Sequence, residues 1–365
     1  MVVTPRVLHV VPSLRGGGAE AVCAALVQGL GPHGFAATGL VCIGDAGAPG
    51  MRALGRATQR DPRLLWDLRR ALAGLCREGG PALVHTHLGW PLYLVRLARA
   101  GLPGGAAVLH VHTEHSTGGV RRRPTLRALE RSVYRGVDRV YAISPGVRDA
   151  LAGWLGSRTV PIDVVWNGAR TLALARRAAP QGAVRLVSVG ALADHKGLDV
   201  ALDAVARVGS AVVEYRLVGV GSEREALERQ AAALGLADRV RFVGWADDPT
   251  PHLHWAHALL MPSRREGFGL AAIEALSTGL PVLGARVSGL IDALEGVGAA
   301  ATLVAPDDPQ ALAAAITALA ALSDEAYAAM AAPARAHALR FDEPTMVRRY
   351  AEAYRRLLEE RGARG

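Results

Sequence analysis

The sequence predicts an α/β protein built from two doubly wound, Rossmann-like domains. Short runs rich in valine and leucine alternate with longer amphipathic segments along nearly the whole chain, which is typical of parallel sheets with helices on both faces. Twelve such runs occur, more than a single sheet usually holds. The chain of 365 residues is also longer than one hydrophobic core normally requires. We therefore expect two sheets of about six strands each.

The candidate strands divide evenly between the two halves of the chain. In the first half they are residues 6–11, 38–43, 82–87, 107–112, 139–144 and 162–166. In the second half they are residues 184–190, 213–219, 239–244, 258–262, 281–285 and 301–306. Helical patterns lie between nearly all of these runs, so neighbouring strands are expected to run parallel.

The boundary between the domains is expected within residues 168–183, which lack a strand pattern and end with a proline and a glycine. This gives a first domain over residues 1–170 and a second over residues 171–342. Residues 343–365 begin with a helical pattern of apolar side chains. We expect this last helix to pack back on the first domain, because its apolar stripe needs a partner.

The chain is strongly basic, with a formal net charge of +9 and a pI of about 10.1. A nucleic-acid partner is disfavoured, because the aromatic side chains that would stack on bases make up only 5% of the residues and are scattered. An anionic membrane surface, a phosphorylated small molecule, or a coding bias toward arginine and alanine would each explain the charge.

The cysteines and the apolar segments predict a cytoplasmic protein. Cys23, Cys42 and Cys76 are too far apart for a metal or redox motif and are expected to be reduced thiols. The N-terminal residues have the pattern of a first strand and not of a signal peptide. The longest uncharged apolar stretch, residues 309–323, is shorter than the ~20 residues that a spanning helix needs. We expect a monomer or homodimer that is soluble or at most rests on a membrane surface.

Residues 262–282, PSRREGFGLAAIEALSTGLPV, follow a candidate strand at its carboxyl end, where open α/β sheets bind ligands. Gly267 and Gly269 let backbone amides approach a ligand, and the helix after them offers free N–H groups to an anion. Glu266 and Glu274 only accept hydrogen bonds, so the ligand must also carry hydroxyl groups. The combination predicts a nucleoside diphosphate sugar. The alternative is one glutamate that starts a helix and one that faces solvent.

Other loops between strands and helices carry weaker signals of the same kind. Gly190 and Lys196 lie in one such loop, where a lysine is a natural phosphate ligand. Gly219 and Gly221 form an incomplete dinucleotide fingerprint, for which a tight turn is the alternative. In the first domain, the glycines around Gly17 line a second helix mouth. Together these loops strengthen the prediction of a phosphate-bearing ligand.

The segment LHVHTEHS places His110 and His112 on one face of a strand and His115 in the loop that follows. A zinc site is conceivable there, but the spacing matches no helix-borne or finger-type ligand pattern. We expect His115 to be a polar residue facing a binding cleft. The other strand histidines are expected to be structural: His85, His87 and His110.

Taken in order, several segments resemble the family 4 retaining glycosyltransferases, and the resemblance covers nearly the whole chain. The segments are GGGAE, TEHS, AISPGV, VVWNGA, VGALADHKG, VGVGSE, VRFVGW and PSRREGFGLAAIEALSTGLPV. The resemblance implies the GT-B fold, in which two Rossmann-like domains face a cleft and a C-terminal helix crosses back to the first domain. It implies that the first domain binds the acceptor and the second binds the nucleotide-sugar donor.

The resemblance also implies functions for single residues. Lys196 would hold the diphosphate, Glu266 the transferred sugar and Glu274 the ribose. His115, or less readily His112, would face the reacting sugar, which makes His115, Lys196 and Glu266 the expected catalytic residues. The backbone of two residues, Phe242 and Val243, would read the base. The other expected donor-binding residues are Gly17, Gly190, Gly221, Gly267, Phe268, Gly269 and Leu270.

One position departs from the family pattern. The family often has an arginine after the glycine at position 190, where it shares the diphosphate with the lysine, and this chain has Ala191. Either another basic residue, such as Arg264 or Arg265, replaces it, or the donor is bound less tightly.

We expect transfer of a sugar from a UDP-hexose or UDP-N-acetylhexosamine, with GDP as the alternative nucleotide, to a hydroxyl of a small natural-product or cyclitol acceptor. No metal or resident cofactor is expected, because the chain has no D-x-D motif. The alternatives are a sugar-nucleotide epimerase of the same fold, an inactive binding protein, and a lipid- or polysaccharide-directed transferase at the membrane.

The acceptor is expected to be phosphorylated or cationic. Arg121, Arg122 and Arg123 would face a phosphorylated acceptor or anionic lipid headgroups, with a solvated helix start as the alternative.

Overall fold

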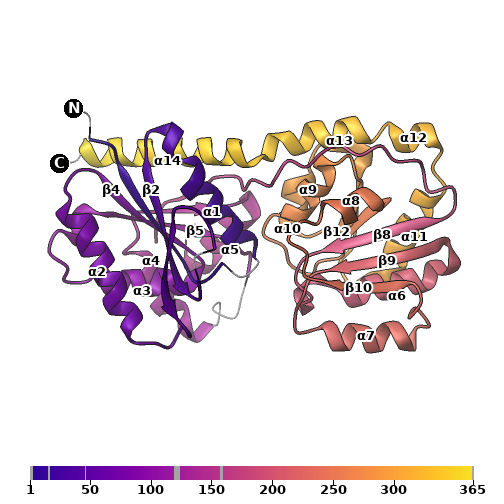
Figure 1. Cartoon of the computed structure of the whole chain (residues 1–365), viewed down its shortest axis with the longest axis horizontal. Coiled ribbons are helices and arrows are strands. Elements are labelled where there is room, and N and C mark those ends of the chain that lie inside the picture. Colours follow the sequence, from indigo (N-terminus) through magenta and orange to yellow (C-terminus); the bar gives the residue numbers. More distant parts are fainter. Residues whose placement is uncertain (1–2, 15–16, 46, 119–123, 157–158, 364–365) are drawn as a thin grey trace. The chain divides into compact units, whose positions relative to one another are not determined.

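The computed structural model describes residues 3–363 except 15–16, 46, 119–123 and 157–158, and it divides the chain into two compact units (Figure 1). Unit 1 comprises Met1–Gly168 and Glu343–Gly365, and unit 2 comprises Ala169–Asp342. Each unit has its own parallel sheet, so the predicted α/β class with two sheets is confirmed.

Unit 1 contains a parallel sheet of seven strands in the order β3-β2-β1-β4-β5-β6-β7. The strands are β1 (Arg6–Val11), β2 (Ala36–Ile43), β3 (Met51–Arg56), β4 (Ala82–His87), β5 (Leu109–Glu114), β6 (Arg139–Ala142) and β7 (Ile162–Val164). The helices are α1 (Gly18–Gly29), α2 (Arg63–Arg77), α3 (Gly89–Arg99), α4 (Arg127–Tyr134), α5 (Pro145–Leu155) and α14 (Glu343–Gly362). The strand order reverses between β1 and β4, and ligands of such sheets bind at the carboxyl end of this switch point.

Helices cover both faces of this sheet. Successive residues of a strand point to opposite faces, so neighbouring residues pack in different clusters. Val7 of β1 packs in a cluster with side chains of α1 and α14, and Leu8 packs in a second cluster with side chains of α2 and α3. Helix α14, yellow in Figure 1, lies beside α1 of the same unit. It buries Tyr350 and Tyr354 completely. The C-terminal helix is therefore part of the core of unit 1.

Unit 2 contains a parallel sheet of six strands in the order β10-β9-β8-β11-β12-β13. The strands are β8 (Val184–Val189), β9 (Val212–Val218), β10 (Val240–Gly244), β11 (Ala258–Met261), β12 (Val282–Ala285) and β13 (Ala301–Val304). The helices are α6 (Leu198–Val208), α7 (Arg224–Ala233), α8 (Thr250–Trp255), α9 (Leu270–Ser277), α10 (Ser288–Leu294), α11 (Pro309–Ala320), α12 (Asp324–Ala328) and α13 (Ala331–Ala338). The order reverses between β8 and β11, so the loops that follow these two strands meet at the switch point.

One strand of unit 1 was not predicted. Strand β3 has the sequence MRALGR, in which two of the six residues are exposed, four are partly buried and none is fully buried. It lies at the edge of the sheet beside β2. An edge strand that is half exposed lacks the continuous apolar run by which the central parallel strands are recognised.

In the part of the chain that the structure describes, no single helix is both long and apolar enough to cross a membrane. One pair of segments, Pro309–Ala320 with Asp324–Phe341, meets the length and composition criteria together, with a bend of 110° between them.

Candidate active site

The carboxyl end of the unit 2 sheet brings two predicted residues into direct contact. Lys196 ends the loop after β8, and Glu266 lies in the loop after the neighbouring strand β11. The Lys196 Nζ atom donates to Glu266 Oε2 over 2.7 Å, and the two side chains are 22% and 13% exposed. Since both remain reachable from solvent, this ion pair can open toward a ligand that offers phosphate oxygens to the ammonium and hydroxyls to the carboxylate.

The two loops are joined through their backbones as well. The N–H groups of Arg264 and Arg265 donate to the carbonyl of His195 over 2.9 and 3.3 Å. Gly197 has φ of +61°, and a Cβ atom there would lie 2.1 Å from the carbonyl oxygen of Pro262. Only glycine permits this close approach in the left-handed region. Gly197 therefore fixes the position of the backbone from which the Lys196 side chain extends.

Helix α9 starts at the same edge of the sheet. Its N-cap is Gly269, with φ of +93° and no side-chain cap, so the N–H groups of the first turn from Leu270 onward point toward the loop. The preceding Phe268 is buried and packs edge-on against Phe341, with ring centroids 5.3 Å apart. The side chain of Phe268 anchors the loop, and the positive end of the α9 dipole suits an anion there. The N–H of Gly267 donates to Glu266 Oε1 over 3.2 Å.

Glu274 is neither solvent-facing nor part of the Lys196 pair. It lies on α9, its side chain is 16% exposed, and it accepts a hydrogen bond from Arg170 Nε over 3.2 Å. The alternative of a solvent-facing glutamate is wrong for this residue. Its carboxylate is held by an arginine of the segment that opens unit 2, which sequence spacing did not indicate.

The other glycines and the base-reading positions also lie at this edge. Gly190 has φ of +147°, and a Cβ on Gly221 would lie 2.1 Å from the carbonyl oxygen of Leu192. The loops after β8 and β9 are therefore in backbone contact. At the end of β10, the edge strand of this sheet, Phe242 is half-buried and Val243 is exposed.

In unit 1, His115 lies just beyond the carboxyl end of β5. Its ring is half-buried, and its Nε2 atom lies 3.3 Å from Nδ1 of His87, the last residue of β4. Removal from solvent lowers the pKa of His115 to about 3, so the ring is neutral at physiological pH. His110 and His112 are fully buried and both contact Thr86 Oγ1, so neither is a cleft residue. This burial agrees with the structural interpretation of His110, while the sugar contact expected of His115, or less readily of His112, stays a prediction.

Gly17 caps the N-terminus of α1, but the chain's own carboxylate stands at this helix mouth. A Cβ on Gly17 would lie 2.1 Å from Glu20 Oε2. Burial raises the pKa of Glu20, while a hydrogen bond from its own backbone N–H opposes that rise. A diphosphate would have to displace this carboxylate to reach the amides of α1. Arg121, Arg122 and Arg123 lie outside the described residues.

Comparison with known proteins places these motifs in a family. A sequence profile described as "Glycosyltransferase Family 4" matches residues 16–171, and one described as "Glycosyl transferases group 1" matches residues 183–321. The chain is 30% identical over 312 residues to glycogen synthase of Mycobacterium tuberculosis (strain ATCC 25618 / H37Rv), covering 81% of this chain and 73% of that protein. It is 30% identical over 342 residues to D-inositol 3-phosphate glycosyltransferase 1 of Catenulispora acidiphila, covering 83% and 78%. The chain belongs to glycosyltransferase family 4.

The fold of a solved structure agrees with this assignment. The chain superposes on Anabaena HepE in complex with UDP and glucose with a TM-score of 0.81 at 20% identity, covering 95% of this chain and 98% of that one. The GT-B fold predicted from the motifs is thereby confirmed, as is the prediction that the protein is a glycosyltransferase. Across the curated relatives compared, the matched share of their own length runs from 38% to 78%.

The structure distinguishes between Arg264 and Arg265, the two residues considered as replacements for the family arginine at the position of Ala191. Arg264 donates to both carboxylate oxygens of Asp199, over 2.9 and 2.6 Å, and to Asp307 over 2.7 Å. These carboxylates raise the pKa of Arg264 and hold its guanidinium between the first turn of α6 and the loop before α11. Of the two arginines considered, Arg264 is therefore engaged in the scaffold of this glycosyltransferase, while Arg265 is exposed.

Sequence reasoning missed two features at the carboxyl end of the unit 2 sheet. Among the 42 lysine and arginine residues of this glycosyltransferase, Lys196 is the only lysine. The use of a lysine at one position of an arginine-rich chain indicates a functional position, and a count of residue types reveals it. The second feature is Trp245, which follows β10, is 56% exposed and donates its Nε1–H to Asp247 over 2.8 Å.

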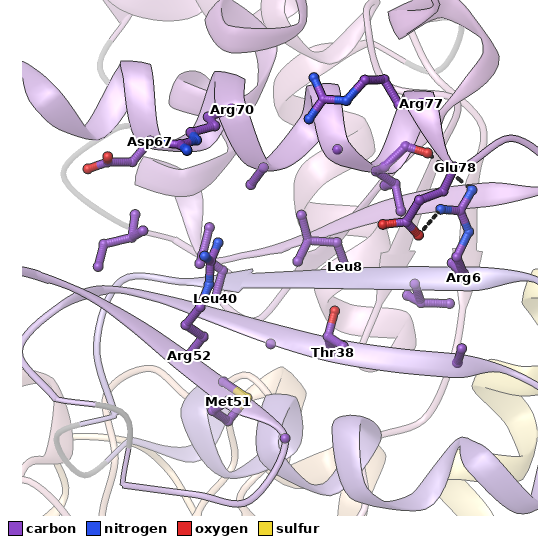
Figure 2. A pocket seen from close by; sticks show the side chains of 18 residues that line it. Arg6, Leu8, Thr38, Leu40, Met51, Arg52, Asp67, Arg70, Arg77 and Glu78 are labelled. Carbon is purple, nitrogen blue, oxygen red and sulfur yellow. Dashed lines mark hydrogen bonds and ion pairs between the residues drawn. The ribbon is translucent and has the colours of Figure 1, made fainter.

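Unit 1 also has a hollow away from these residues. It measures about 740 Å³ and lies between α2 and the amino-terminal halves of β1, β2 and β3 (Figure 2). Leu8 lies on its floor, and Arg52, Arg70 and Arg77 are among the basic residues that line it. None of the residues described as lining it is a predicted site residue. This hollow is therefore at the opposite end of the strands from His115.

Proposed function

We propose that this protein is a retaining, metal-independent glycosyltransferase that moves a hexose or N-acetylhexosamine from a UDP-sugar to a hydroxyl of a small acceptor. The observation that carries the proposal is the Lys196–Glu266 pair beside the N-terminus of α9. This group offers a cation and backbone N–H groups to a diphosphate and a carboxylate to sugar hydroxyls, all from one edge of one sheet. Glu274 would hold the ribose.

The proposed chemistry is displacement on one face of the sugar. The bond from the anomeric carbon to the leaving phosphate oxygen breaks, and a bond from the same carbon to the acceptor oxygen forms on the same face. The acceptor's proton passes to the departing phosphate oxygen. Negative charge grows on the diphosphate, and preorganised donors aimed at such charge are usually the largest catalytic contribution. Lys196 and the first-turn amides of α9 would supply them, and His115 would face the reacting sugar.

The nucleotide and the sugar are supported by similar proteins. The structures of Anabaena HepE include complexes with UDP and with UDP-glucose. Phe242 and Val243 lie at the end of the edge strand β10, where main-chain atoms would read the base. Arg265 would take over the contact to the diphosphate that Ala191 cannot make. We therefore place a UDP-hexose before a GDP-sugar.

The acceptor that we propose is a phosphorylated cyclitol or a related small natural product. Relatives at 30% to 33% identity are named as D-inositol 3-phosphate glycosyltransferases, and the net charge of +9 favours an anionic substrate. Unit 1 would bind this acceptor and unit 2 the donor. We place the enzyme in the cytoplasm, with peripheral contact to a membrane as the alternative location.

Release of UDP from a panel of UDP-sugars, measured with and without cyclitol phosphates, tests the proposal. Acceptor-dependent release, with an anomeric configuration by NMR that matches the donor, is the expected result. Isomerised sugar without acceptor identifies an epimerase instead, and binding without turnover identifies an inactive protein. The matched variants are Lys196→Ala and, as a control for loss of a basic side chain, Arg229→Ala on α7, whose side chain is 74% exposed.

A further inference from the structure

Three imidazoles stand in a row at the switch point of unit 1. His9 lies on β1 and His87 ends the neighbouring β4, while His115 follows β5. The Nδ1 atom of His9 lies 3.0 Å from Nε2 of His87, and Nδ1 of His87 lies 3.3 Å from Nε2 of His115. The row runs from the fully buried His9 to the half-buried His115.

All three rings are neutral. Burial lowers the pKa of His9 and of His115 to about 3, and burial together with the neighbouring imidazoles lowers the pKa of His87 well below its ordinary value. A neutral imidazole has one N–H and one lone pair, on opposite nitrogens. Each of the two contacts between neighbouring rings needs an N–H on one ring and a lone pair on the other. The three tautomers are therefore coupled, and only two proton arrangements satisfy both hydrogen bonds.

The two arrangements differ at the ends of the row. In the first, every Nδ1 carries the proton, so His9 donates to His87 and His87 donates to His115. In the second, every Nε2 carries the proton and the direction of donation is reversed. The Nε2 atom of His9 is buried and has no partner among the described residues. The second arrangement would bury an N–H without an acceptor there, whereas the first leaves only a lone pair. Unpaired buried N–H groups are rarer than under-used acceptors.

We propose that this row holds His115 in the tautomer with the proton on Nδ1, so that His115 acts as a hydrogen-bond donor and His9 and His87 are its positioning residues. The assignment of a substrate contact to His115 rests on the proposed function, but the tautomer does not. A donor at this atom suits an oxygen that gains negative charge or a hydroxyl used as an acceptor.

A second buried network keeps the row in place. His85, which pairs with His9 across β1 and β4, contacts Tyr354 Oη over 2.5 Å and Thr113 Oγ1 over 2.7 Å. Its ring centroid lies 4.2 Å from that of His87. Both nitrogens of His85 are thus used by hydroxyl groups, and the ring restricts movement of His87.

A metal ion is the competing explanation for this cluster. His9, His85 and His87 each offer a nitrogen, and these atoms lie within 4.8 Å of one another. Both nitrogens of His85 and both nitrogens of His87 are already in hydrogen bonds, so ligation would break one hydrogen bond of each ring. The existing pairing therefore favours the row of tautomers.

The test is a histidine-selective ¹⁵N NMR measurement on the full-length protein, which distinguishes protonated Nδ1 from protonated Nε2. We expect His115 with Nδ1 protonated in the wild type. In His87→Phe we expect a shift toward the Nε2–H form that free imidazole side chains prefer, with kcat lowered about three- to tenfold by loss of one oriented hydrogen bond. His110→Phe removes another buried histidine outside the row and is the control that leaves the His115 tautomer unchanged.

A His115 with protonated Nε2 in the wild type would overturn the proposal, and so would stoichiometric zinc or nickel retained by the wild type and lost in His9→Leu. The wild-type spectrum decides even if His87→Phe does not fold. If no transferase activity is found and the Nδ1 tautomer is present, the proposed function fails and the row stands. If transfer is found and His115 carries its proton on Nε2, the proposed function stands and the proposal for the row fails.

Discussion

Lys196 is the residue whose removal tests the donor site most directly. In the variant Lys196→Ala the diphosphate loses one charge-assisted hydrogen bond, which is worth about 1.5–3 kcal/mol. That alone lowers kcat/KM about 10- to 150-fold. The same change strips Glu266 of the ammonium that lies 2.7 Å from its carboxylate. If a phosphate binds about 5 Å from this unpaired carboxylate, Coulomb's law with an effective dielectric constant of about 20 gives about 3 kcal/mol of repulsion.

This second contribution gives a specific expectation for the double variant. Glu266→Gln removes the repelling charge and costs about 1 kcal/mol for one weakened sugar contact. The double variant Lys196→Ala/Glu266→Gln is therefore expected to be more active than Lys196→Ala alone. Steady-state UDP release with saturating acceptor measures kcat/KM for the three variants and the wild type.

Additive losses in the double variant would refute the reasoning, because they would mean that the carboxylate does not face the diphosphate. Loss of less than threefold in Lys196→Ala would refute it more broadly. Chemical modification gives an independent measurement, since the chain has one lysine. Acetylation of that side chain should abolish turnover, and UDP should protect it from the reagent.

Three further predictions concern stability. Gly197→Ala forces a side chain to within 2.1 Å of the Pro262 carbonyl at a positive φ, and urea unfolding should show a loss of more than about 2 kcal/mol. Arg264→Ala breaks the contacts to Asp199 and Asp307 and should lower the unfolding free energy of unit 2 by about 1 kcal/mol. Arg265→Ala should leave the unfolding free energy unchanged and raise the KM for the donor. Equal effects of the two variants on stability would contradict the structural role of Arg264. The pKa of His9 is lowered to about 3 by burial, so the folded state binds fewer protons than the unfolded chain between pH 3 and 6.5. Stability present at pH 7 is then lost on acidification, by about 2 kcal/mol between pH 7 and 5 for this residue, and a flat urea midpoint over that range would speak against a neutral buried His9.

The sequence was sufficient where one local pattern decides the outcome. Buried parallel strands are continuous apolar runs, and twelve of the thirteen strands in the described part of the chain were recognised in this way. That Lys196 and Glu266 lie close together was also predictable, because both are in loops that follow strands at the carboxyl end of the sheet. Strand β3 was missed because none of its residues is fully buried and two of the six are exposed at the sheet edge.

Contacts that depend on distant segments were not predictable. Arg264 and Asp307 are 43 positions apart, and only the adjacency of their loops makes them partners. The row of histidines requires His9 to be paired in register with His85 across β1 and β4, which no local pattern fixes. The pairing of Glu274 with Arg170 likewise depends on how the first segment of unit 2 crosses α9.

The way in which the chain leaves and re-enters unit 1 has a practical consequence. Ala169 donates its N–H to the carbonyl of Phe341 over 2.9 Å and forms a parallel bridge with Asp342. The two ends of unit 2 therefore touch, and the segment between them can be expressed as a self-contained fragment for titration with nucleotides. Deleting the last 23 residues, Glu343–Gly365, would have the opposite effect. It would leave unit 2 intact and uncover the apolar face of unit 1 that α14 covers, although the deleted residues are far in the sequence from the rest of unit 1.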